Sequence, residues 1–133
     1  MNKKVLDTNI LIRFFTTDNK VMADKAETLI KNAKKNELVI SDVIIAEIVW
    51  VLESFYELPK NEIIEKLEGL LNLDKFDINK NLLFKTIEYY KNSNISYTDA
   101  YLLAFNSVSV KNGTIYSFDK GLKKVDATVK KPN

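Results

Sequence analysis

The sequence contains no cysteine and no histidine among its 133 residues. Without cysteine there is no disulfide framework, no thiolate nucleophile and no cysteine-ligated zinc site. Without histidine there is no Ser-His-Asp triad, no imidazole general base and no RNA-cleaving pair of imidazoles. Any hydrolytic chemistry must therefore use carboxylates, hydroxyls, lysine, or a metal ion held by oxygen.

Glycine and proline are also scarce, with three and two residues, whereas 46% of the residues are hydrophobic and 29% are charged. This composition is typical of a compact domain rich in helices and strands, and we expect one domain over residues 1–133. The longest apolar run, residues 43–52, is half as long as a membrane span and contains Glu47. No targeting segment is evident, so we expect a soluble, cytoplasmic protein.

Net charge is only +2, which does not by itself indicate a nucleic-acid partner. Positive charge is concentrated near the C-terminus, where five lysines accompany only Asp119 and Asp126. The ordinary explanation of this excess is a solvated lysine-rich tail.

Hydrophobic periodicity divides the chain into alternating strands and helices. Short apolar runs predict strands at residues 5–6, 37–41, 76–78, 114–118 and 127–129. Apolar residues at helical spacing predict helices at residues 10–15, 19–35, 43–56, 61–72, 79–92 and 96–110. Asp18 and Asp42 are predicted helix caps, and Lys120-Gly121 is a predicted turn. The alternation predicts an α/β fold, a three-layer α/β/α sandwich around a mainly parallel sheet of four to five strands.

Acidic residues stand at the junctions of this pattern. Asp7 and Asp119 each follow a predicted strand and should project from the same edge of the sheet. Asp99 lies in the first turn of a helix, and Glu47 lies inside the most apolar helix. Each also has an ordinary structural explanation, as a helix cap, a turn residue, a partner of the helix dipole or a salt-bridge partner.

Electrostatic repulsion would decide the chemistry if these four acids converged. Two carboxylates about 4 Å apart repel by roughly 4 kcal/mol at an effective dielectric constant near 20. A cluster of four therefore needs protons or a divalent cation, and oxygen ligands favour Mg²⁺ or Mn²⁺. Such an ion would suit phosphodiester hydrolysis. The spacing of the acids along the sequence leaves both explanations open.

Four sequence blocks carry a family resemblance. They are Val5-Leu6-Asp7-Thr8-Asn9-Ile10-Leu11, Ala46-Glu47-Ile48-Val49-Trp50-Val51-Leu52, Thr98-Asp99-Ala100 and Ser117-Phe118-Asp119-Lys120. With these blocks in this order, the chain resembles the PIN-domain ribonucleases, and specifically the VapC-type toxins of bacterial and archaeal toxin–antitoxin pairs. The resemblance extends over essentially the whole chain.

The resemblance implies a metal-dependent endoribonuclease in which Asp7, Glu47, Asp99 and Asp119 hold one or two Mg²⁺ or Mn²⁺ ions. Water would attack the phosphate of single-stranded or structured RNA and leave 5′-phosphate and 3′-hydroxyl ends.

Supporting roles follow from the same resemblance. Thr8 and Asn9 would order the first acid, and Ser117 stands where relatives often have threonine. Relatives often have a polar residue and then phenylalanine after the last acid, where this chain has Lys120-Gly121-Leu122. Arg13 and Lys120 are candidates to hold the RNA backbone, and Lys123 and Lys124 are weaker ones.

A homodimer and a small antitoxin, which would lie across the active-site groove, are also implied. Some aromatic residues could contact such a partner, although core packing is the favoured role for most of them: Phe14, Phe15, Trp50, Phe55 and Tyr56.

Other classes of protein fit less well. A haloacid-dehalogenase-like phosphatase needs a second aspartate where this chain has Asn9, and a receiver domain would have only Asp77 as its phosphoacceptor. The remaining alternative is a catalytically inactive PIN-like module that binds RNA or a protein, against which the presence of all four acids speaks.

Overall fold

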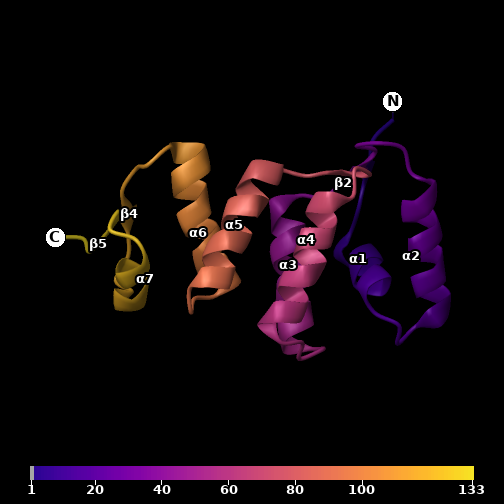
Figure 1. Cartoon of the computed structure of the whole chain (residues 1–133), viewed down its shortest axis with the longest axis horizontal. Coiled ribbons are helices and arrows are strands. Elements are labelled where there is room, and N and C mark those ends of the chain that lie inside the picture. Colours follow the sequence, from indigo (N-terminus) through magenta and orange to yellow (C-terminus); the bar gives the residue numbers. More distant parts are fainter. Residues whose placement is uncertain (1) are drawn as a thin grey trace. The chain divides into compact units, whose positions relative to one another are not determined.

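The computed structural model describes residues 2–133. The chain forms two compact units, of which unit 1 extends to Asn79 and unit 2 comprises Lys80–Asn133. Each unit contains helices and short parallel strands (Figure 1). The single domain predicted over residues 1–133 stays a prediction.

Unit 1 is built on a three-stranded parallel sheet in the order β1-β2-β3. Its elements in chain order are β1 (Lys4–Val5), α1 (Thr8–Phe15), α2 (Lys20–Asn32), β2 (Leu38–Val39), α3 (Asp42–Ser54), α4 (Lys60–Asn72) and β3 (Phe76–Asp77). Helix α1 packs against α2 and α3, and α3 packs against α4 (Figure 1).

The core of unit 1 takes side chains from helices and strands alike. Fully buried residues come from α1, β2, α3, α4 and β3 in turn: Leu11, Leu38, Ile48, Leu67 and Phe76. These residues belong to the apolar periodicity that predicts the elements, and their burial is what holds the helices on the sheet.

The caps of α2 and α3 differ from those predicted. Asn19, not Asp18, caps α2 and accepts a hydrogen bond from the Met22 N–H at 3.1 Å. Ser41, not Asp42, caps α3 and accepts one from the Ile44 N–H at 3.3 Å. In each case the true cap is the residue directly before the first helical residue.

Asp18 instead joins the end of α1 to the segment after α3. It accepts hydrogen bonds from the Tyr56 hydroxyl at 2.9 Å and from Thr16 at 3.2 Å, and it pairs with Arg13 at 3.3 Å. The pKa of Asp18 is lowered, mainly by the hydrogen bond from Tyr56. The hydrogen bond from Thr16 and the charge of Arg13 act in the same direction. These partners occupy the carboxylate that the sequence assigns to capping.

Unit 2 contains helices around a two-stranded parallel sheet, β4-β5. Its elements are α5 (Lys80–Asn92), α6 (Tyr97–Phe105), the π-helix η1 (Asn106–Val110), β4 (Ile115–Tyr116), α7 (Lys120–Val125) and β5 (Val129–Lys130). Helix α5 packs along α6. One buried cluster joins α6, β4, α7 and β5 through Leu103, Ile115, Leu122 and Val129.

The helix predicted through residue 110 changes from α to π geometry at Asn106. Asn106 is buried, and its amide donates to the Gly113 carbonyl at 2.9 Å and to the Thr128 hydroxyl at 3.3 Å. A Cβ at Gly113 would lie 2.7 Å from Val110 Cγ1, so a larger residue there would require the Val110 side chain to move. The wider helical turn ends in Lys111, which is left-handed, and leads into β4.

The turn predicted at Lys120-Gly121 is wrong, because these residues begin helix α7. Asp119 caps this helix through hydrogen bonds from the N–H groups of Gly121 at 2.8 Å and Leu122 at 3.2 Å. Glycine is a poor helix former, which hides this short helix in the sequence. Burial of Leu122 in the cluster of unit 2 compensates for it.

Every strand pairing in the described chain is parallel, as predicted, but the five strands do not form the single sheet that was expected. They form a three-stranded sheet and a two-stranded sheet. No helix within residues 2–133 is long and apolar enough to cross a membrane.

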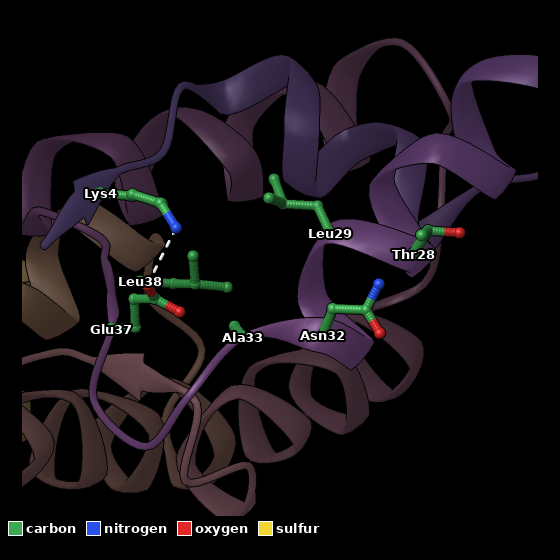
Figure 2. A pocket seen from close by; sticks show the side chains of 7 residues that line it. All are labelled: Lys4, Thr28, Leu29, Asn32, Ala33, Glu37 and Leu38. Carbon is green, nitrogen blue, oxygen red and sulfur yellow. Dashed lines mark hydrogen bonds and ion pairs between the residues drawn. The ribbon is translucent and has the colours of Figure 1, made fainter. Parts of the chain in front are cut away.

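Glu37 provides a test of the packing in unit 1. This buried residue accepts hydrogen bonds from the Lys34 N–H and the Lys4 ammonium, each at 2.9 Å, beside a small cavity (Figure 2). The hydrogen bond from Lys34, then that from Lys4, lowers the pKa of Glu37 below its usual 4.5. The charged carboxylate therefore stabilises the fold above that pH, and its contribution is lost as the pH falls through the folded-state pKa.

We expect Glu37→Gln to lower the urea midpoint at neutral pH and to reduce the further fall of that midpoint on acidification. Urea unfolding of both proteins over a series of pH values measures this difference. Parallel pH profiles for wild type and variant would show that Glu37 has no such role.

Candidate active site

The amino end of α1 brings two of the predicted acids together. Asp7 follows β1, is exposed, and caps α1 by accepting the Thr8 N–H at 2.8 Å. Thr8 is buried, and its hydroxyl donates a short hydrogen bond to Oε1 of Glu47 on α3. Thr8 thus joins the cap of α1 to the carboxylate of α3. Thr8, which was predicted to support the first acid, is therefore hydrogen-bonded to both Asp7 and Glu47.

Glu47 is exposed although its helix is the most apolar of the chain. The core-facing side of α3 carries Ile45, Ile48, Val49 and Leu52. Glu47 stands on the other side of the helix, so the cost of burying its charge does not arise. Glu47 forms no salt bridge with the described residues of unit 1, and its hydrogen-bond donor there is Thr8.

Two further predicted residues of unit 1 lie on α1. Asn9 is exposed at the second position of the helix, directly after Thr8. Arg13 lies in the last turn, is half-buried, and pairs with Asp18. Its Nε is buried without a hydrogen-bond partner among residues 2–133. Arg13 is therefore engaged in the fold at the end of α1 opposite Asp7.

Asp99 occupies the first turn of α6, as predicted. Its N–H donates to the hydroxyl of Ser96, the cap of this helix, at 3.1 Å. The Ser-x-x-Asp spacing is close to that of a capping box, and this signal could have identified Ser96 as the residue that fixes the first turn. Asp99 is half-buried in unit 2.

Asp119 follows β4 and is exposed at the start of α7. Its N–H donates to Oγ of Ser117 at 3.0 Å, so the hydroxyl expected in support of this acid does contact it. Lys120, Lys123 and Lys124 follow on α7 at spacings that place them on one exposed face. Helix α7 and the loop before α6 lie toward the same end of unit 2 (lower in Figure 1).

The two acids that follow strands use one oxygen each for capping. Oδ1 of Asp7 accepts the Thr8 N–H, and Oδ1 of Asp119 accepts from Gly121 and Leu122. No hydrogen-bond donor of residues 2–133 contacts Oδ2 of either residue within its own unit. Helix capping and metal binding are therefore compatible roles for the same carboxylate.

The charge of the four acids is not balanced by local cations. Within its own unit, none of them forms an ion pair with a lysine or arginine of residues 2–133. Each unit contains two of the four acids. Over the described residues, no group of three or more acids that could hold a metal ion occurs. Oxygen donors without a cationic partner are the type of ligand that Mg²⁺ and Mn²⁺ prefer. The residues present fit a divalent ion in their chemistry.

The aromatic residues near this region are less buried than expected. Trp50 and Phe55 are 65% and 74% exposed, so core packing is wrong for these two. Phe14, Phe15 and Tyr56 are half-buried. The reason for Trp50 is its position on α3, on the side away from the buried residues.

The sequence matches the PIN domain family over residues 4–128. The chain therefore belongs to the PIN domain family, and the match extends over both units. No individual curated protein matches it. The predicted α/β fold class is confirmed. PIN domains are generally nucleases that act on nucleic acids with divalent metal ions, so at this level the chain is a hydrolase of the nuclease type.

Asp119 allows its structural role to be separated from any chemical one. Asp119→Ala removes the cap of α7 and should lower the free energy of unfolding by about 1 kcal/mol. Asp119→Asn keeps a capping oxygen and should stay within a few tenths of a kcal/mol of wild type. Urea unfolding measures both. Equal stability of the alanine and asparagine variants would show that the cap contributes nothing.

Proposed function

We propose that this chain is a metal-dependent endoribonuclease and the toxin of a toxin–antitoxin pair. The observation that carries the proposal is the bridge from Asp7 through Thr8 to Glu47 in a member of the PIN domain family. This bridge holds two exposed carboxylates beside the amino end of α1, and neither forms an ion pair with a lysine or arginine among residues 2–79. The positive end of the helix dipole adds a preference for anionic groups there, such as an RNA phosphate.

The proposed metal ligands are Asp7, Glu47, Asp99 and Asp119, acting on one or two Mg²⁺ or Mn²⁺ ions. When bound, such an ion neutralises charge on the phosphate and makes water a better nucleophile. The protein contributes rigid placement: each of the four acids lies on a helix or caps one. Precise placement of ligands on regular elements favours catalysis over mere binding.

The remaining residues orient the acids and the RNA. Thr8 donates to Glu47, and Ser117 accepts from the Asp119 N–H, so each fixes one carboxylate-bearing segment. Asn9 extends the polar surface at the start of α1. Lys120, next to Asp119 and exposed, is the better-supported contact to the RNA backbone. Arg13, already paired with Asp18, is the weaker one.

Attack by water in line with the leaving 3′ oxygen gives a 3′-hydroxyl on one fragment and a 5′-phosphate on the other. A nuclease that used the 2′-hydroxyl would instead leave a 2′,3′-cyclic phosphate. The cognate antitoxin, the homodimer and the cytoplasmic location belong to the same proposal.

Isosteric neutralisation of the acids tests it. Asp7→Asn, Glu47→Gln and Asp99→Asn should each lower cleavage of single-stranded RNA by about 10²-fold or more, because each removes a charge that holds the metal. Cleavage should stop in EDTA and return with Mg²⁺ or Mn²⁺. A time course of labelled RNA on a gel measures the rate, and analysis of the fragment ends gives their chemistry.

Asp24→Asn is the matched control, since Asp24 is an exposed acid on α2 with only a 3.6 Å pair to Lys20. It should cleave as wild type does. Cyclic phosphate ends would contradict attack by water. If wild type itself does not cleave, and the acid variants bind Mn²⁺ and RNA as wild type does, the chain is a catalytically inactive PIN-like binding module.

A further inference from the structure

The exposed side of α3 carries a tryptophan next to the candidate metal ligand. Trp50 lies three residues after Glu47, and Val43 lies four residues before it. Residues at these spacings share one face of a helix. All three are exposed, Trp50 at 65% and Val43 at 75%. The indole ring therefore lies about one helical turn from a carboxylate that Thr8 holds in place.

The charges of α3 restrict what this ring can bind. The face that carries Trp50 also carries Glu47, and the helix contains no lysine or arginine. A phosphate group is repelled by such a surface unless a metal ion lies between them. An uncharged, flat group has no such penalty and gains by stacking on the indole. In an RNA strand that group is the nucleobase.

We propose that Trp50 is a substrate-binding residue that stacks on a base of single-stranded RNA, beside the phosphate held at Glu47. This inference rests on the proposed nuclease function and adds a residue that contacts an unpaired base of the substrate. Stacking on an aromatic side chain requires a base that is free of its neighbours, which a loop or single strand offers and a duplex does not. Trp50 thereby selects unpaired RNA without reading its sequence.

Fluorescence tests the contact directly, because Trp50 is the only tryptophan of the chain. The wild-type protein in Mg²⁺ is titrated with a short single-stranded RNA, with a blunt-ended duplex of the same RNA, and with a base-free ribose-phosphate chain of equal length. Emission is read on rapid mixing, before cleavage. Tryptophan emission should be quenched by the single strand and by neither of the other two. Quenching of equal size by the base-free chain would overturn the proposal.

Kinetics give a second, independent readout. Trp50→Leu should raise KM for single-stranded RNA by about 5- to 150-fold with little change in kcat, and Trp50→Phe should restore most of the loss. Phe55→Leu is the control, because Phe55 is as exposed as Trp50 but follows the end of α3. It should leave KM unchanged. Since Trp50 is exposed, the leucine variant should fold. If it does not, the fluorescence titration and the phenylalanine variant still test whether Trp50 contacts a base.

The outcomes separate this proposal from the nuclease function. Acid-dependent cleavage with no quenching and an unchanged KM in Trp50→Leu overturns the stacking contact and leaves the nuclease intact. Quenching by single strands without any cleavage supports the contact and overturns the nuclease. A dimer that Trp50→Leu dissociates, with emission that depends on protein concentration in the absence of RNA, shows a second copy on this face and overturns the contact.

Discussion

The hydrogen bond from the Thr8 hydroxyl to Glu47 is the contact on which the candidate site depends. It crosses from α1 to α3, two helices that pack together but are separated by α2 and β2 in the chain. Because Thr8 is buried and its N–H also binds Asp7, one residue sets the positions of two carboxylates. Leu11 on α1 and Ile48 on α3 are fully buried in the core of unit 1, where the two helices pack together. The site is therefore a consequence of the core.

The capping carboxylates have a structural role that is compatible with the metal binding proposed for them. Asp7 and Asp119 each lie between a strand and the next helix, and each caps that helix through one carboxylate oxygen. The other oxygen stays available for an ion. A strand followed by a capping acid places negative charge at a helix amino end, where the macrodipole tolerates it. Helix capping after a strand therefore accounts for the positions of both Asp7 and Asp119, one in each unit, without any functional role.

The sequence predicts the elements well where long apolar periodicity exists, as in α3 and α5, and the positions of Asp7, Asp99 and Asp119 follow from strand ends and helix starts. It fails where a tertiary contact decides. Asp18 accepts a hydrogen bond from Tyr56 and does not cap α2. Asn106 forms hydrogen bonds with distant residues at the point where the helix widens to π geometry. Burial of Leu122 stabilises α7 although Gly121 is a poor helix former. The sequence also does not predict the exposure of Trp50, because a helix that is apolar on all sides does not show which side faces the core.

Anomalous diffraction from crystals soaked in Mn²⁺ tests the central claim most directly. An anomalous peak within coordination distance of both Asp7 and Glu47 is the expected result, with the Thr8 hydroxyl still bonded to Glu47. Clear density for both carboxylates with no peak between them, at a Mn²⁺ concentration that supports binding in solution, would contradict the assignment of this pair as metal ligands.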